Sequence, residues 1–230
     1  MKISYMFQSE EVDTITCDVV FDEETLLLTD PVQEELPPWT ALENCKCSNC
    51  PLSEMENPYC PIAVRLLPLA KIFGGVPSYK PMVAVVVTPE RKIINDTTVQ
   101  QAMSSLLGLI MPLSGCPHFD FLKPMARFHL PFSSMEETIF RATSTYLLGN
   151  HFLKCQGLAA QEGLTGLSEL YGELQKVNQG LSKRLRSSGD FMETNAVAIL
   201  DVYAQTIPFV IDDFVTDLGK VLSAYQDVKS

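Results

Sequence analysis

Residues 3–21 read ISYMFQSEEVDTITCDVVF, two runs in which apolar and polar side chains alternate. Alternation with a period of two is typical of a β-strand with one buried face. The polar stretch 9–13 between the runs predicts a turn, so the two strands should pair as an antiparallel hairpin. A short third strand is expected over Leu26–Leu28. The N-terminus therefore predicts a small antiparallel sheet.

Further along the chain, the pattern changes from strands to helices. Residues 82–87, MVAVVV, are continuously apolar and predict a strand covered on both faces, with a hairpin partner in Arg91–Asn95. From Thr97 onward the spacing is helical, and Thr97 or Thr98 is expected to cap a helix that reaches about Met111.

A second helix start is expected at residues 133–137, SSMEE. Ser133 and Ser134 each stand three residues before a Glu, which is the spacing of a capping box. The helix after them should reach about Leu153. Sheet first and helices afterwards predict an α+β fold. With 230 residues, we expect a single domain over 1–230, with a β-rich part (1–96) that carries a cysteine-rich loop and a helical part (97–230).

The acidic charge lies in one quarter of the chain. Residues 1–60 hold 13 acidic residues against Lys2 and Lys46, which is the whole net charge of −11. An acidic surface repels phosphate backbones, so nucleic acid is not an expected partner. The first residues lack the basic start and apolar run of a signal peptide, and no apolar stretch approaches the roughly 20 residues that span a bilayer. We expect a cytoplasmic protein with no membrane contact, whose thiols stay reduced.

The cysteine-rich loop contains residues 45–61, CKCSNCPLSEMENPYCP. Cys47 and Cys50 have the two-residue spacing of a metal-binding turn, and Cys60 follows at the start of an expected helix. Thiolates in a tetrahedron are typical ligands of structural zinc. The sequence therefore predicts a structural zinc site on Cys47, Cys50 and Cys60.

The fourth ligand has three candidates. Cys45 is close to Cys47 in the sequence, but with only one residue between them the two sulfurs could bind the same ion only with strain. Cys116 and His118, both in SGCPH (114–118), are the others, and Cys116 is preferred. An iron–sulfur cluster on the same cysteines is an alternative, because a cluster cysteine followed by proline occurs in ferredoxins. Thiols that simply pack as small apolar side chains are a further alternative.

Residues 114–132, SGCPHFDFLKPMARFHLPF, suggest another possible site. Cys116 and His118 can form a thiol nucleophile with its base, while Arg127 and His129 bind an anion or a metal. In the competing interpretation the aromatic and aliphatic residues are core material, and Arg127 and His129 satisfy buried carbonyl groups. No complete catalytic motif is present, and an enzyme is the less expected outcome.

Residues 164–185 repeat apolar side chains at alternating spacings of three and four, with Asn178 as the polar member. This is the seam of a coiled coil, and it predicts either a helix packed on its own domain or a contact with a partner protein or a second copy. Near its end, Lys183, Arg184 and Arg186 are expected to stabilise the helix dipole.

Five stretches together resemble an uncharacterised bacterial protein family. They are CSNCPL (47–52), YCPIA (59–63), SGCPH (114–118), FLKPMARFHLPFSSMEET (121–138) and YLLGNHF (146–152). The resemblance covers nearly the whole chain and implies that the cysteines at positions 47, 50, 60 and 116 recur, whereas Cys45 is incidental. It implies no activity.

These observations lead to one expected function and two alternatives. We expect a non-enzymatic interaction or regulatory domain that a structural zinc ion stabilises. An iron–sulfur or thiol redox sensor is the first alternative. A thiol- or metal-dependent enzyme built on Cys116, His118, Arg127 and His129 is the second.

Overall fold

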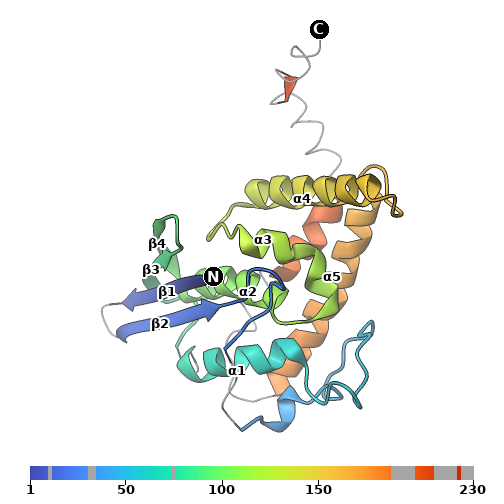
Figure 1. The fold of residues 1–230 in the computed structure, drawn as a ribbon. Helices are drawn as coiled ribbons and strands as arrows, with labels where there is room; N and C mark the ends of the chain where they lie inside the picture. The colour runs from blue at the N-terminus through green and yellow to red at the C-terminus, as the bar shows by residue number, and fades with distance from the viewer. Residues whose placement is uncertain (10–11, 31–34, 74–75, 188–199, 210–221, 224–230) are drawn as a thin grey trace.

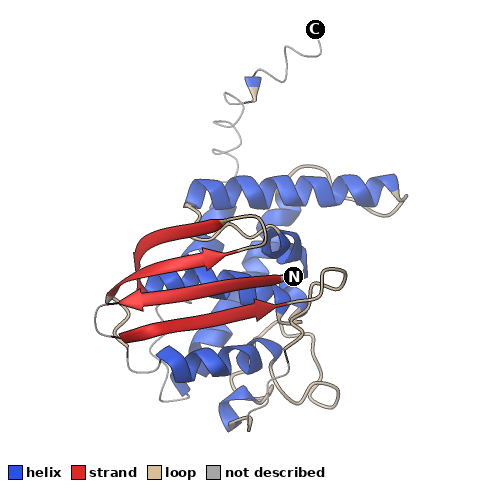
Figure 2. Ribbon diagram, turned by 60° about the vertical axis from the view of Figure 1, so that its left-hand side comes forward, coloured by secondary structure: helices blue, strands red, loops and turns tan. Residues whose placement is uncertain are grey.

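A four-stranded antiparallel sheet forms one layer of the protein. The computed structural model describes residues 1–230 except 10–11, 31–34, 74–75, 188–199, 210–221 and 224–230 (Figure 1). The strand order is β2-β1-β3-β4, and the described helices lie mostly on one side of the sheet (Figure 2). The strands are β1 (Lys2–Ser9), β2 (Val12–Val20), β3 (Pro81–Val87) and β4 (Lys92–Thr98). The α+β class predicted from the sequence is confirmed.

The hairpin expected at the N-terminus is present, with Tyr5 of β1 opposite Cys17 of β2. The expected hairpin partner of β3 is present as well, as β4. The third strand predicted over Leu26–Leu28 is wrong. Leu26 has a φ of +52°, which no strand residue adopts, and only Leu28 makes an isolated bridge, to Phe21. Strand β3 pairs with the other edge of β1 instead.

The helical layer follows the sheet in the chain. Its elements are η1 (Pro38–Thr40), α1 (Pro61–Phe73), α2 (Val99–Leu113), η2 (Pro117–Leu122), α3 (Lys123–Arg127), α4 (Met135–Cys155) and α5 (Thr165–Ser187), and residues 200–209 are helical too. Thr98 caps α2 through its side chain, and Ser134 forms a complete capping box with Glu137 at the start of α4. None of the described helices is long and apolar enough to cross a lipid bilayer.

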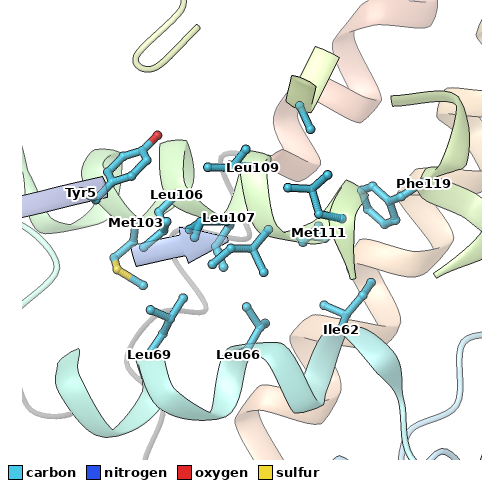
Figure 3. Packing of buried hydrophobic residues seen from close by; sticks show 14 of the residues in the cluster. Tyr5, Ile62, Leu66, Leu69, Met103, Leu106, Leu107, Leu109, Met111 and Phe119 are labelled. Atoms are coloured by element: carbon cyan, nitrogen blue, oxygen red, sulfur yellow. The ribbon is translucent and has the colours of Figure 1, made fainter. Parts of the chain in front are cut away.

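The core lies between the sheet and the helices. Ile3, Tyr5 and Phe7 point from β1 toward the helical layer and are fully or almost fully buried. Leu66 and Leu69 of α1 face the buried side of α2 (Figure 3). One continuous cluster of buried apolar residues extends from β1 through α2 to α5. The apolar face of the sheet and the apolar faces of the helices thus bury one another.

The seam of α5 belongs to this core. Six seam positions are at most 4% exposed, namely Leu167, Tyr171, Leu174, Asn178, Leu181 and Leu185. The face predicted as a possible partner or dimer surface is therefore covered within the chain itself. Apolar residues at this spacing serve equally well in a helix that packs on its own domain, so the pattern alone does not distinguish the two outcomes.

Candidate metal centre and the cysteine loop

A second side of α5 holds the cysteine-rich loop. Glu173, Val177, Gly180 and Arg184 follow one another at helical spacing, about a third of a turn away from the seam. We call this the loop-facing side of α5. The amide nitrogen of Asn49 donates to the Glu173 carbonyl at 3.0 Å and to its carboxylate at 2.8 Å. The Cys47 sulfur lies 3.8 Å from the Val177 carbonyl oxygen.

Arg184 is the strongest tie between the loop and the helix. Its side chain is buried, at 1% exposure, and it donates to the carbonyl oxygens of Trp39, Ala41 and Leu42. No ion pair to a carboxylate is formed by Arg184 in the described part of the chain. The sequence-based interpretation of this arginine as a dipole stabiliser missed its main role. Its helical spacing from Gly180 and Val177 is the signal that would have placed it on a buried face.

The predicted metal ligands lie on three separate segments. Cys47 and Cys50 form a turn in which the Cys50 N–H donates to the Cys47 carbonyl at 3.0 Å. Cys60 directly precedes α1 and donates its N–H to the Thr40 carbonyl at 2.8 Å. Cys116 is the N-cap residue of η2 and is buried.

The pKa values of two of these thiols are influenced by the other predicted ligands. Burial raises the pKa of Cys47 to about 11, and the thiols of Cys60 and Cys50 raise it further, whereas Arg184 opposes the shift. Burial likewise raises the pKa of Cys116 to about 12, with further contributions from Cys60, Cys47 and Cys50. Cys47 and Cys116 are thus each influenced by the other predicted ligands, and we call Cys47, Cys50, Cys60 and Cys116 the thiol cluster.

The other cysteines lie apart from the thiol cluster. Cys17 is buried in the sheet, where burial first and the neighbouring Asp18 second raise its pKa to about 11. Cys155 is exposed at the end of α4, with its sulfur 3.5 Å from His151 Nε2. Cys45 adopts a φ of +51° and does not contribute to the shifts of Cys47 and Cys116.

The thiol cluster is not a closed coordination sphere. Among the described residues, no group of three or more His, Cys, Asp and Glu side chains is arranged so that it could hold a metal ion as placed. The alternative ligand His118 is engaged elsewhere, because its Nε2 lies 2.8 Å from the Asn49 carbonyl oxygen. The donor set itself suits zinc or an iron–sulfur cluster: four thiols, two of them on one tight turn and two at helix starts.

The residues of the enzyme hypothesis have separate partners. Arg127 forms an ion pair with Glu23 at 2.9 Å. His129 Nε2 lies 2.5 Å from the Tyr5 hydroxyl, and burial lowers its pKa to about 3, so the ring is neutral at pH 7. In the described part of the chain, no hydrogen bond or ion pair joins Cys116, His118, Arg127 and His129 to one another. The expectation that Arg127 and His129 satisfy buried carbonyls is not met by any hydrogen bond among the described residues, whereas Arg141 donates to the Met125 and Phe128 carbonyls.

Gly180 allows the close approach of Cys47 to α5. A Cβ atom at position 180 would stand 2.6 Å from the Cys47 sulfur and 3.2 Å from its Cα, whereas one at Gly172 would meet nothing within 4 Å. We expect Gly180→Ala to lower the free energy of unfolding by about 1–3 kcal/mol, the usual cost of overpacking. Gly172→Ala on the same helix should raise it by up to about 1 kcal/mol, since alanine favours helices. Urea unfolding followed by circular dichroism measures both, and equal effects would contradict the close approach.

Comparison with known proteins identifies one family. A family model described as a domain of unknown function matches residues 3–223. No curated protein and no solved structure matches the chain. The match agrees with the resemblance to an uncharacterised family that the sequence motifs suggested.

Proposed function

The chain belongs to the family described as Domain of unknown function (DUF6901), and from its thiol cluster we propose a non-enzymatic interaction or regulatory domain with a structural zinc ion. The ligands in this proposal are Cys47, Cys50, Cys60 and Cys116. The observation that carries it is that Cys50 and Cys60 act on Cys47, and that all three act on Cys116 from a distant segment of the chain.

The surroundings of the thiol cluster support a bound cation. Four thiolates around a divalent ion leave a net negative charge, which is costly to bury without compensation. Arg184 supplies a buried positive charge close enough to lower the pKa of Cys47, and no described carboxylate pairs with it.

A zinc ion at this place would clip the loop to the helical layer. Cys47 and Cys50 belong to the loop, Cys60 precedes α1, and Cys116 precedes η2, so one ion would join three elements. Because this chain is long enough to bury its own core, the ion would order the loop rather than fold the whole domain.

The outer part of the loop suits a binding role. Met55 at its tip is 98% exposed, and Glu54 and Glu56 beside it are exposed too. Met55 is the most exposed large apolar side chain in the described part of the chain, and methionine adapts readily to a contact surface. We propose this tip as the contact surface for a protein partner with an apolar and basic face.

Elemental analysis of protein purified without oxygen, together with a visible spectrum, tests the proposal. We expect one zinc per chain and no visible colour. Cys50→Ser should lose the zinc, because a hydroxyl is a poor substitute for a thiolate. Cys45→Ser, a change in the same loop but outside the thiol cluster, is the matched control and should keep it.

Two other results would each have a clear meaning. Iron with inorganic sulfide and a brown colour would replace zinc by an iron–sulfur cluster on the same cysteines and favour the redox sensor. If the reduced protein took up neither zinc nor iron, the metal proposal would be wrong, and the thiol cluster would be apolar packing.

A further inference from the structure

A pocket of about 350 Å³ lies inside the helical layer. Its walls come from α2, η2, α3, the segment 129–133, α4, α5 and residues 200–204, together with residues of β4. Pockets of about 300–1,000 Å³ are typical of sites that hold small organic molecules. The pocket is lined by the seam side of α5, so it is separate from the thiol cluster on the loop-facing side.

Arg141 of α4 brings a positive charge to this pocket. All of its hydrogen bonds in the described part of the chain come from one nitrogen, Nη2, which donates to the Met125 and Phe128 carbonyls at 2.8 Å each. Its Nη1 and Nε have no acceptor among the described residues, and no described carboxylate lies within ion-pair distance. The buried hydroxyl of Tyr171 and the carboxylate of Glu137 both act on its charge, and Glu137 is engaged in the capping box at the start of α4. A guanidinium with unused donors is suited to binding a carboxylate.

Asn178 of α5 supplies a second unused polar group. Its side chain is 3% exposed and lines the pocket, and its amide oxygen has no hydrogen-bond partner among the described residues. A buried acceptor without a donor destabilises the fold, so its presence needs an explanation. A ligand with an N–H or O–H group would provide the missing donor.

The rest of the lining is mainly apolar. Phe119, Leu122, Met125 and Leu174 contribute aromatic and aliphatic surface. Tyr171, two turns before Asn178 on the same face of α5, has its pKa raised by burial and therefore presents a neutral hydroxyl. Apolar walls with a few unsatisfied polar groups are the usual composition of a ligand site.

We infer that this pocket binds a small organic acid with an apolar body. The carboxylate would lie against Arg141, the apolar body against Phe119 and Leu174, and a donor group on the ligand would reach Asn178. This binding activity is independent of the proposed metal centre.

Indole-3-acetate is a suitable probe, because it has an aromatic body, a carboxylate and one N–H donor. In isothermal titration calorimetry we expect a Kd of about 0.1 mM, as ordinary ligand efficiencies imply for its size. Indole-3-acetamide, which lacks the charge, should bind at least tenfold more weakly. The 1-methyl derivative, which lacks the donor, should bind several-fold more weakly.

Three variants test the two contacts separately. Arg141→Gln should weaken indole-3-acetate at least tenfold and remove the preference over the amide. Arg127→Gln is the matched control, since this arginine pairs with Glu23 outside the pocket, and it should bind as the wild type does. Asn178→Leu should remove the preference for the unmethylated probe. It also removes an unsatisfied acceptor, so its melting temperature should stay the same or rise.

The failing results are equally specific. Absence of binding by all three probes to the wild-type protein would overturn the inference, as would an Arg141→Gln variant that binds the acid as tightly as the wild type. If Arg141→Gln did not fold, Asn178→Leu would decide: an unchanged preference for the unmethylated probe would also overturn it.

Discussion

Arg184→Ala is expected to lower the free energy of unfolding by about 3–5 kcal/mol, because it removes a donor from three carbonyl groups and truncates a large buried side chain. The guanidinium donates to three carbonyl groups of the loop, at Trp39, Ala41 and Leu42. Removing it takes a donor from each of these carbonyls, of which Ala41 keeps only the Asn44 N–H among the described residues, and opens a cavity on α5. Since small proteins are stable by about 5–15 kcal/mol, the variant should unfold at a much lower urea concentration.

Two neighbouring substitutions give this prediction its controls. Arg186→Ala changes an exposed arginine of the same helix and should alter the stability by no more than about 0.5 kcal/mol. Arg184→Lys keeps the charge but cannot reproduce the planar fork of donors. Its free energy of unfolding should therefore lie between those of Arg184→Ala and Arg186→Ala. If Arg184→Ala and Arg186→Ala had the same urea midpoint, Arg184 would not hold the loop.

Acidification is expected to destabilise the protein through His129. Burial first and the positive charge of Arg141 second lower the pKa of this histidine to about 3 in the folded chain, against about 6.5 when unfolded. The unfolded chain therefore binds more protons between these values. The stability that His129 contributes is complete above pH 6.5 and is lost as the pH falls toward 3. The free energy of unfolding should fall by at most about 1.4 kcal/mol per pH unit through this histidine. The total loss between pH 6.5 and 4 should be about 2–3 kcal/mol.

The surroundings of His129 explain why it stays neutral. The buried hydroxyl of Tyr5, whose pKa is raised by burial, keeps its proton and is hydrogen-bonded to His129 Nε2. Arg141 from α4 repels a second positive charge, and no described carboxylate faces the ring. A protonated imidazole in this place would be a buried charge beside Arg141 without a counter-ion among the described residues.

Glutamine substitutions isolate this contribution. His129→Gln keeps a hydrogen-bonding group near Tyr5 but does not titrate, so its stability should fall less steeply than that of the wild type between pH 6.5 and 4. His151→Gln, at an exposed position of α4, should leave the wild-type slope unchanged. Urea unfolding at several pH values measures the slopes, and a His129→Gln slope equal to that of the wild type would contradict the assignment.

Local patterns were sufficient to predict much of the fold. The alternation in β1 and β2, the apolar run of β3, the cap at Thr98 and the capping box at Ser134 are all signals carried by neighbouring residues. Each depends on backbone geometry within a few positions, and each is present in the structure. The third strand failed because the left-handed backbone of Leu26 interrupts an otherwise apolar segment.

The candidate sites were predictable only in part. Spacing singled out Cys47, Cys50 and Cys60, because a metal-binding turn is itself local. The unused donors of Arg141 and the unsatisfied oxygen of Asn178 could not be inferred, since a pocket arises only where distant helices meet.

By itself the sequence determined the α+β class, most element boundaries and the set of cysteines that merit a metal hypothesis. Tertiary structure alone decided that the α5 seam is covered by its own domain and that Arg184 is buried while Arg186 is exposed. It also decided that Cys47 packs against α5 at Gly180, where a larger residue would not fit. The physical reason is that hydrogen bonding and side-chain alternation act over a few residues, whereas desolvation depends on which surfaces the whole chain brings together.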